Sequence, residues 1–400
     1  MPRDLVVGNG TILVNIDRNL NIRDFYYPHV GLHNHVNGHA NRVGVWVDGL
    51  FAWIDETWQV ELGYRPRSLT TDVRASNGRL GISLRFSDTV HPELNLFLRR
   101  VSVENLLTTE REIRLFLHHD FRIYETEVGD TAFFHPESGS IIHFKRDCHI
   151  LMSGRTHTAE GIFEYAAGVK EFGGAEGTWR DAEDGSLSNH PIEQGSVDST
   201  ISFRLRVPGS DSDSVSCWIA LGRSLDEVTS LNALASSSFE GLMAESEKYW
   251  VSWVEKAAVL DGDLRKEHGL ADLYERSLLT LETQIDRCGG ILAANDTDIM
   301  QTARAHYSYV WPRDGAFVGH AMDLAGYARP MKRFLSFCAS ILPLDRAFFL
   351  QKYCPDGSLG AIWHPWIVDG QPEVPCQQDS TALVIWAAGK HFDQWKDKDY

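Results

Sequence analysis

The stretch VSCWIALGRSLDEVTSL, from Val215 to Leu231, contains the point where a strand-forming sequence becomes a helix-forming one. Its first half ends a long series of segments with a period of two, which is typical of strands. Ser224 and Glu227 then form a capping box, in which both side chains can bind amides at a helix start. The sequence therefore predicts three parts: a β domain over 1–222, a helical linker over 223–262 and a helical domain over 263–400.

The residues before this point alternate between apolar and polar, as β-strands do. VGVWVDGLFAWI, from Val43 to Ile54, consists of two alternating runs joined by Asp48-Gly49, a strong signal for a two-residue hairpin. We expect another hairpin over Ser199–Gly222, around a polar Gly/Ser/Asp loop. Many strands with almost no helical periodicity indicate a large antiparallel sandwich.

The residues after this point show helical periodicity. Helices are predicted over 224–257 and 264–286, and another is expected to begin at Pro330 and to stop at Pro343. The run ALVIWAA, Ala382–Ala388, is apolar on every face. We therefore expect the helix that contains it to be buried all round.

The composition describes a globular protein and argues against two classes of partner. Of the 400 residues, 43% are hydrophobic and 23% are charged, and the formal net charge is −17. Nucleic acids and anionic membranes favour basic surfaces, so we expect neither as a partner. The N-terminus has no signal-peptide pattern, no apolar stretch is long enough to cross a bilayer, and the six cysteines are scattered. These features predict a cytoplasmic protein with reduced thiols.

The stretch YSYVWPRDGAF, which begins at Tyr307, combines a helix start with side chains suited to a sugar. Pro312 fits the first helical turn, and Asp314 would then favour the positive end of the helix dipole. Tyr307 and Trp311 offer flat faces for an apolar ring surface, while Arg313 and Asp314 can donate to and accept from hydroxyls. A purely structural role, with Asp314 as a helix-start acid and Arg313 as its counter-ion, explains the same residues.

The long connection from Asp345 to Gln378 is a second candidate. Loops of this length are usually functional or disordered, and the aromatic density here argues against disorder. Its aromatic and imidazole side chains include Phe348, Phe349, Tyr353, Trp363, His364 and Trp366. It leads into Gln377-Gln378-Asp379, where Asp379 could contact a ligand or cap the helix that follows.

Neither a metal nor another cofactor is expected. His29, His33, His35 and His39 lie close together in sequence, and imidazole is a common metal ligand. Because their loop has no cysteine or carboxylate at ligand spacing, we predict no metal site there. The sequence contains no G-x-S-x-G, P-loop or G-x-G-x-x-G motif, so a serine-hydrolase elbow and a nucleotide cofactor have no support.

Taken together, these stretches resemble family 15 of the glycoside hydrolases, the glucoamylase and glucodextranase family. The resemblance rests on GGILAANDT, YSYVWPRDGAF, QKYCPDGSLGAIWHPWIVDG and PCQQDSTALVIWAA, which occur in this order between Gly289 and Ala388. The N-terminal half, with FYYPHVGLHNHV and RVGVWVDGLFAWI, is similar to the prokaryotic glucoamylase-like members. The resemblance covers essentially the whole chain. It implies a multidomain β + α fold, with an N-terminal antiparallel β-supersandwich, a helical linker and the first part of an (α/α)6 toroid.

The resemblance also implies a substrate and the residues that bind it. Members hydrolyse α-glucans or gluco-oligosaccharides with inversion, releasing glucose from non-reducing ends. The matching substrate-lining positions are Tyr307, Trp311, Arg313, Asp314, Gln377 and Asp379, with Trp363 or Trp366 as the stacking platform. The catalytic acid and base would be expected beyond Tyr400, so no residue of this sequence is assigned to catalysis.

Three alternatives to this interpretation stay open. Asp314 and Asp379 could themselves be the acid and base, although Arg313 next to Asp314 favours the ionised form and suits it poorly as a general acid. A disaccharide phosphorylase of similar architecture would use phosphate in place of water and would need an anion site. A non-catalytic carbohydrate-binding protein would keep the substrate-lining residues without the catalytic pair.

Overall fold

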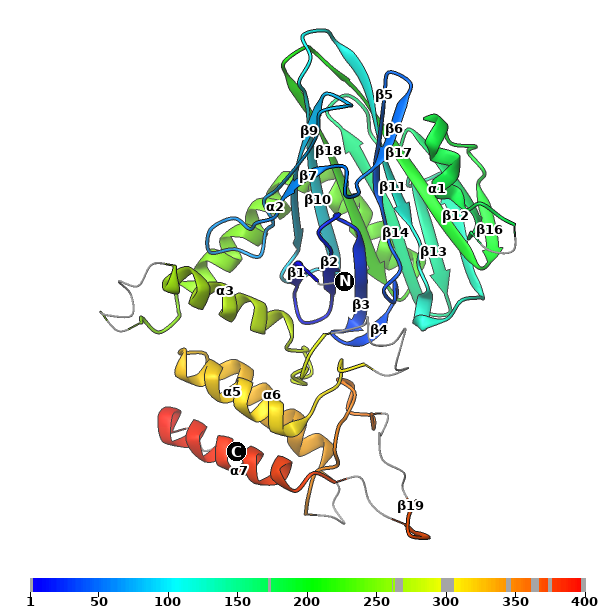
Figure 1. Cartoon of the computed structure of the whole chain (residues 1–400). Helices are drawn as coiled ribbons and strands as arrows, with labels where there is room; N and C mark the ends of the chain where they lie inside the picture. Colours follow the sequence, from blue (N-terminus) through cyan, green and yellow to red (C-terminus); the bar gives the residue numbers. More distant parts are fainter. Residues whose placement is uncertain are drawn as a thin grey trace. The chain divides into compact units, whose positions relative to one another are not determined.

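The computed structural model describes residues 3–171, 174–260, 262, 269–295, 306–342, 347–360, 367–372 and 376–396. Strands fill the first part of the chain and helices the second (Figure 1). The chain divides into two compact units, of which the first consists of Met1–Gly8, Val14–Phe25 and Asn34–Tyr249. The second consists of Asn9–Leu13, Tyr26–His33 and Trp250–Tyr400. Two short N-terminal segments thus belong to the helical unit, whereas the predicted domain limits divide the chain at single positions.

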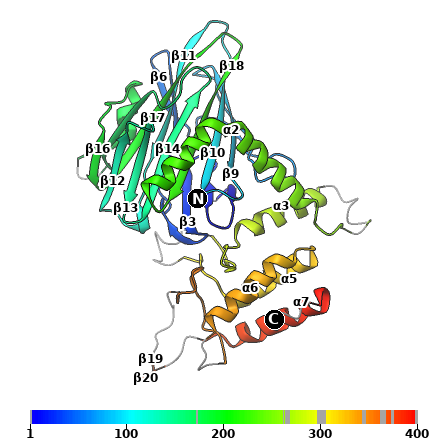
Figure 2. The same cartoon turned by 180° about the vertical axis from the view of Figure 1, so that it is seen from behind.

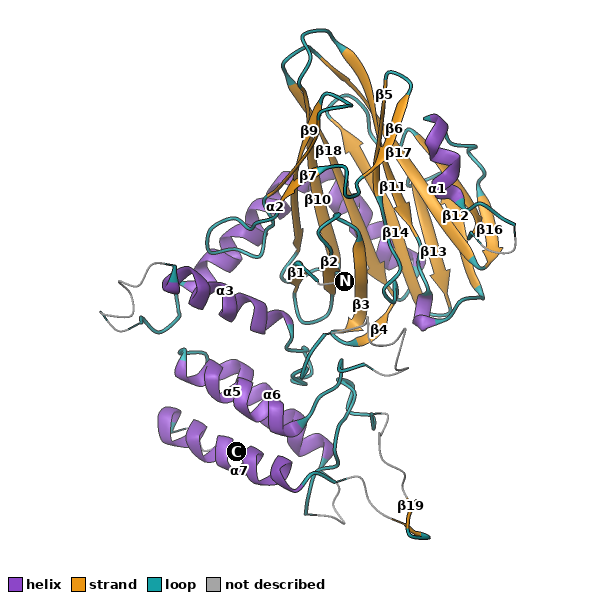
Figure 3. Ribbon diagram, viewed as in Figure 1, coloured by secondary structure: helices purple, strands orange, loops and turns teal. Residues whose placement is uncertain are grey.

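Two large antiparallel sheets and one small sheet contain most of the strands (Figure 3). The nine-stranded sheet has the order β16 (Ile192–Gly195), β12 (Asp130–His135), β13 (Ser140–Lys145), β14 (Cys148–Thr156), β18 (Ser212–Gly222), β10 (Leu96–Asn105), β9 (Ile82–Val90), β8 (Val73–Asn77), β7 (Gln59–Glu61). The five-stranded sheet has the order β15 (Glu164–Val169), β17 (Val197–Val207), β11 (Arg111–His119), β5 (Val43–Val47), β6 (Leu50–Trp53). The four-stranded sheet has the order β1 (Leu5–Gly8), β2 (Leu13–Ile16), β3 (Ile22–His29), β4 (Leu32–Asn34), and β19 (Ile367–Val368) pairs with β20 (Gln371–Pro372).

The helices are short within the strand-rich part and long after it. They are α1 (Thr178–Asp181), α2 (Leu225–Val254), α3 (Leu270–Thr283), α5 (Pro312–Leu324), α6 (Ala328–Ile341) and α7 (Gln378–Trp395), with 3-10 turns η1 (Ile123–Glu125) and η2 (Ala182–Asp184). The helices predicted at 224–257, 264–286 and from Pro330 are confirmed as α2, α3 and α6, with ends that differ by a few residues. Across the described ranges, none of these helices has the length and apolar character needed to span a bilayer.

The hairpin predicted at Asp48-Gly49 is confirmed. β5 and β6 pair antiparallel, with Val47 opposite Leu50. Asp48 (φ 52°) and Gly49 (φ 80°) both have a left-handed backbone, which a two-residue type I′ turn requires. Aspartate and glycine are among the residues that adopt this conformation at low cost, so the turn follows directly from the sequence.

The hairpin predicted over Ser199–Gly222 is wrong. β17 pairs with β11 and β15 in the five-stranded sheet, whereas β18 pairs with β10 and β14 in the nine-stranded sheet. The loop between these two strands therefore carries the chain from one sheet to the other. Alternation identifies the buried face of each strand, but it cannot identify the hydrogen-bonded neighbour.

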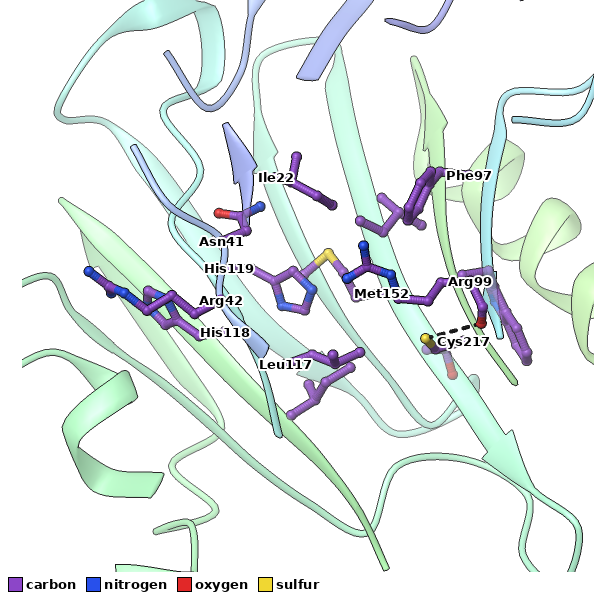
Figure 4. Close-up of a pocket in the computed structure, with 14 residues that line it drawn as sticks. Ile22, Asn41, Arg42, Phe97, Arg99, Leu117, His118, His119, Met152 and Cys217 are labelled. Carbon is purple, nitrogen blue, oxygen red and sulfur yellow. Dashed lines mark hydrogen bonds between the residues drawn. The ribbon is translucent and has the colours of Figure 1, made fainter. Parts of the chain in front are cut away.

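The interior between the two large sheets contains polar groups as well as apolar ones. The His143 ring on β13 lies 2.8 Å from the Ser199 hydroxyl on β17 and so connects the sheets. A cavity of about 20 Å³ lies in this interior, and Figure 4 shows Arg99, His119 and Met152 around it. This volume accommodates about one water molecule, so the cavity is a packing feature and is too small for a sugar.

A buried ion pair lies beside this cavity. Arg99 on β10 donates from Nε and Nη2 to both carboxylate oxygens of Asp88 on β9, at 2.9 and 2.7 Å. Its guanidinium also lies 5.5 Å from the ring centres of Phe86 and Phe97. Both charged side chains are at most 5% exposed. Because both charges are removed from water, the attraction between them has to offset the free energy lost on desolvation.

The predicted capping box begins α2. The Ser224 hydroxyl accepts from the Glu227 amide at 3.3 Å, and the Glu227 carboxylate accepts from the Arg223 amide at 2.8 Å. The helix then lies over the nine-stranded sheet (Figure 2). Phe239 of the helix and Trp218 of the sheet belong to one buried apolar cluster. The switch from strands to helices therefore begins with a helix that covers a sheet.

Two glycines allow α5 and α6 to pack closely in the second unit. A Cβ atom on Gly315 would lie 2.3 Å from the Phe334 ring, and one on Gly319 would lie 2.5 Å from the Met331 sulfur. Both contacts are shorter than atoms permit, so larger residues at either position would move α6 away. The close approach fixes the start of α5, which carries the candidate site.

The expectation that α7 is buried all round is wrong for the described structure. Ser380, Val384, Ala387 and His391 form one buried stripe, whereas Ile385 is 67% exposed. Within the described residues α7 packs against α5 and α6, which cover one side of it. An apolar run indicates which residues favour burial, but it does not supply the neighbours that bury them.

The burial of the Arg99–Asp88 pair gives a stability prediction with a matched control. We expect Asp88→Ala to lower the free energy of unfolding by about 3–5 kcal/mol, because it leaves Arg99 charged and buried without a partner. Asp72→Ala removes the partner of Arg85, a bidentate pair of similar geometry (2.7 and 2.8 Å) on the exposed face of the same sheet. That variant should lose no more than about 1 kcal/mol in urea unfolding. Equal losses in the two variants would contradict the assignment.

Candidate functional site

The start of α5 has the conformation predicted for it. Trp311 is the N-cap, with an extended backbone (φ −92°, ψ 121°), and Pro312 is the first helical residue. The proline costs no hydrogen bond there, because first-turn amides have no partner within the helix. Asp314 follows in the first turn, where the helix dipole favours a carboxylate. Asp314 therefore has the helix-start position that the sequence predicts. A further role in binding a ligand depends on its side-chain contacts.

Arg313 brings together carboxylates from two helix starts. Its Nη2 lies 3.0 Å from Asp314 Oδ2, and its Nη1 lies 3.5 Å from Asp379 Oδ2 at the start of α7. The three side chains are between 33% and 50% exposed, so all can contact a ligand. One guanidinium pairs with two carboxylates, and both carboxylates keep further acceptor positions. The predicted residues thus form one cluster of donors and acceptors suited to hydroxyl groups.

Gln377, not Asp379, is the N-cap of α7. Gln377 has an extended backbone (φ −111°, ψ 115°), and the helix begins at Gln378, so Asp379 already lies in the first turn. The capping role considered for Asp379 is therefore wrong, because its backbone is helical. The Gln377 Oε1 atom is buried and accepts no hydrogen bond from any described residue. This acceptor belongs to the residue two positions before Asp379 in the sequence.

Aromatic rings extend this cluster. The rings of Tyr307 and Trp311 are nearly parallel, with centroids 5.9 Å apart and an interplanar angle of 29°. Trp311 is 4% exposed and Tyr307 is 38% exposed. Tyr307 is therefore the exposed ring of this pair, and Trp311 is the buried one. An exposed ring beside charged groups suits the apolar face and the hydroxyls of one sugar.

Lys352 is a residue of this site that the sequence analysis missed. Its Nζ atom lies 4.5 Å from the Tyr309 ring centre and 5.0 Å from the Trp311 ring centre. The residue has no exposed surface, and burial lowers the pKa of its ammonium to about 8. Two backbone hydrogen bonds between Val310 and Tyr353, at 2.8 and 2.9 Å, hold the neighbouring residue Lys352 next to Trp311. The one sign of Lys352 in the sequence is its place between Phe349 and Tyr353 in the aromatic-rich connection.

A second contact holds the two site helices together. Both Asp323 carboxylate oxygens on α5 lie 2.9 Å from the His391 Nδ1 atom on α7, and Trp395 Nε1 donates to Oδ1 at 3.0 Å. Asp323 has no exposed surface, and burial raises the pKa of its carboxyl group. The pairs Arg313–Asp379 and Asp323–His391 show that α5 and α7 run parallel. The geometry of the cluster therefore depends on a buried contact at the other end of both helices.

Two predicted residues and two cavities add nothing to the description of this cluster. Trp363 and Trp366 lie outside the described residues, so their proposed stacking role stays a prediction. A cavity of about 490 Å³, lined by Thr156 and Arg204 among others, belongs to the first unit, as does the small cavity of Figure 4. Neither is lined by a predicted site residue. The candidate site is thus identified by the types and contacts of its side chains and not by a cavity.

Comparisons with known proteins agree with a carbohydrate-active enzyme. No family model matches the sequence. An uncharacterized glycosyl hydrolase of Methanocaldococcus jannaschii is 25% identical over 402 residues, covering 99% of this chain and 60% of the relative. The chain thus spans about three-fifths of the length of this curated relative. It is similar in sequence to a protein named as a glycosyl hydrolase.

Two solved structures share the fold. A bacterial glucoamylase complexed with acarbose matches with a TM-score of 0.70 and 13% identity, over 89% of this chain and 52% of the other. A candidate kojibiose phosphorylase from human microbiome matches with a TM-score of 0.61 and 12% identity, over 98% of this chain and 54% of the other. At such low identity these matches show the fold alone. The fold shared with both structures is a large antiparallel β part followed by helices.

The buried lysine gives a pH prediction for the site. Below a pKa of about 8 Lys352 is charged beside the Trp311 ring, and above it the charge disappears. We expect a change in tryptophan fluorescence with a midpoint near pH 8, because loss of a cation 5.0 Å from the ring alters the field on the indole. Lys352→Met should remove this transition, and Lys390→Met, an exposed lysine on α7, should keep it. An unchanged transition in Lys352→Met would contradict the assignment.

Proposed function

We propose that this protein is an exo-acting, inverting, glucoamylase-like α-glucosidase that releases glucose from the non-reducing ends of α-glucans or gluco-oligosaccharides. The observation that carries the proposal is the cluster in which Arg313 pairs with Asp314 and Asp379, directly after Trp311 and the ring of Tyr307 that stacks on it. The sequence similarity to a glycosyl hydrolase and the fold likeness to a glucoamylase complexed with acarbose support it. On this proposal the β part is a supersandwich and the helical part belongs to an (α/α)6 toroid.

Each residue of the cluster has a role in holding a terminal glucose. Arg313 donates to ring hydroxyls, and Asp314 and Asp379 accept from them, because ionised carboxylates are acceptors only. Tyr307 covers the apolar face of the sugar, and Trp363 or Trp366 provides the second stacking surface. The buried Gln377 acceptor fixes one further hydroxyl. A site that matches hydroxyls in this way discriminates against sugars that lack them.

The chemistry of inversion needs two other carboxylates. An inverting hydrolase uses a protonated acid and an ionised base about 6.5–9.5 Å apart, with water between the base and the sugar. Asp314 and Asp379 both pair with the same guanidinium of Arg313, at the positions that the family resemblance gives to substrate binding. We therefore assign both to substrate binding and assign the acid and base to neither.

Sugar binding tests these roles directly. We expect Asp314→Asn to weaken binding of acarbose or maltotriose by about 10- to 100-fold, because a charged hydrogen-bond acceptor contributes about 1.5–3 kcal/mol. Isothermal titration calorimetry measures this change. Asp356→Asn, at an exposed carboxylate that bonds its neighbour Ser358, is the matched control and should bind as the unaltered protein does. Equal affinity of Asp314→Asn and the unaltered protein would return Asp314 to a helix-start role.

The phosphorylase alternative keeps support from the second structural match. The two reactions differ in the nucleophile, which is water in a hydrolase and phosphate in a phosphorylase. With the polypeptide as its gene encodes it, we expect free glucose of inverted anomeric configuration from maltose or isomaltose, at a rate independent of phosphate. Phosphate-dependent formation of a glucose phosphate would identify a phosphorylase. Sugar binding without either product would identify a carbohydrate-binding protein.

A further inference from the structure

Three side chains of metal-ligand type converge in the second unit, and none of them is one of the candidate sugar-binding residues. His29 at the end of β3, and Asp286 and Cys288 in the turn after α3, place their ligand atoms within 4.8 Å of one another. The histidine belongs to the loop in which the sequence analysis expects no metal, because no cysteine or carboxylate is nearby in sequence. The fold supplies both from a segment 257 residues away.

The turn that carries two of these residues has a well-defined backbone. The Asp286 amide donates to the Gly290 carbonyl and the Gly289 amide donates to the Asp286 carbonyl, both at 2.8 Å. Gly289 has φ 97°, and a Cβ atom there would lie 2.1 Å from the Arg333 carbonyl oxygen. Only glycine fits this position, so the turn holds Asp286 and Cys288 in a fixed relation.

The Asp286 carboxylate is oriented by backbone amides. It has no exposed surface, and it accepts from the Cys288 amide on Oδ1 at 2.7 Å and from the Val30 amide on Oδ2 at 3.1 Å. These two bonds leave further lone pairs on both oxygens. Amide bonds of this kind are the outer contacts that orient a carboxylate ligand towards a metal.

His29 and Asp286 share a hydrogen bond when no ion is between them, and the spacing of their ligand atoms also fits a shared ion. The His29 Nδ1 atom lies 3.2 Å from each carboxylate oxygen of Asp286. Two ligands of a tetrahedral zinc ion, bound at about 2.0–2.1 Å, lie about 3.3–3.4 Å from each other. The Cys288 sulfur is exposed, and the His29 side chain is 23% exposed, so an ion can reach the cluster from solvent.

We propose that His29, Asp286 and Cys288 bind a zinc ion, with water as the fourth ligand. Nitrogen, oxygen and sulfur donors suit zinc, whereas calcium and magnesium prefer oxygen ligands alone. The thiol of Cys288 loses its proton on binding, and His29 binds through a deprotonated Nδ1 with its hydrogen on Nε2. No redox change is involved.

The ion would fix the backbone behind the sugar cluster. The Cys288-Gly289-Gly290 turn continues into Ala293, whose amide donates to the Tyr309 carbonyl at 3.0 Å. The neighbouring segment is also held by the Tyr26 hydroxyl, 3.1 Å from the Ser308 hydroxyl. A zinc ion joining His29 to this turn would therefore stabilise the segment that leads into Trp311.

Metal titration of the full chain after removal of bound metal tests the proposal. We expect one equivalent of zinc to bind at micromolar or lower concentration, with proton release and a rise in the melting temperature. Cobalt in place of zinc should give a thiolate-to-cobalt absorption band. Cys288→Ser should remove this band and weaken zinc binding by more than about 100-fold, because loss of an outer contact alone costs 10- to 100-fold.

Control variants show whether zinc binds at His29 and Cys288 or at other cysteines and histidines of the chain. Cys376→Ser changes the other exposed cysteine, and His33→Gln changes a second histidine of the same loop, so both should keep the zinc affinity and the cobalt band. His29→Gln should lose both. Circular dichroism checks that each variant is folded. Absence of zinc binding by the folded protein, or equal binding by folded Cys288→Ser, would overturn the proposal.

Discussion

Asp323 is a carboxylate with no exposed surface, and a group of this kind must find partners inside the protein. It finds them on α7, where His391 and Trp395 bind its oxygens and Gln394 donates to its backbone carbonyl. If α7 moved along α5, the buried oxygens of Asp323 would lose these hydrogen-bond donors. The two helices therefore have one favoured register. That register places Asp379 opposite Arg313. The geometry of the candidate site therefore depends on Asp323 and His391, which are buried at the other end of the two helices.

The ion pairs of the site itself contribute little to stability. Arg313, Asp314 and Asp379 are partly exposed, and pairs of this kind are screened by water. On the proposed function, their value is in preorganisation, because the donors and acceptors would already be oriented before a sugar binds. Binding then costs less side-chain entropy than it would for free surface residues.

The sequence could predict features that depend on neighbouring residues. The Asp48-Gly49 turn, the capping box at Ser224 and the proline at the start of α5 all follow from local backbone preferences. Features that depend on distant partners could not be predicted. Alternation did not reveal that β17 and β18 lie in different sheets, and apolarity did not reveal that α7 is covered on one side. Lys352 and the His29 cluster were missed for the same reason, since their neighbours come from remote segments.

On the proposed function, the nucleophile is water, and the charges around Arg313 are less suited to phosphate than to a neutral sugar. A phosphorylase must attract a phosphate ion close to the terminal sugar, and this requires cations that are not already balanced by acids. Arg313 faces two carboxylates at 3.0 and 3.5 Å, so a phosphate approaching it would meet two like charges. Lys352 has a pKa of about 8 and is enclosed by Tyr309 and Trp311, which limits its use as an anion site. A neutral sugar meets no such repulsion, and its hydroxyls can use both the guanidinium and the carboxylates.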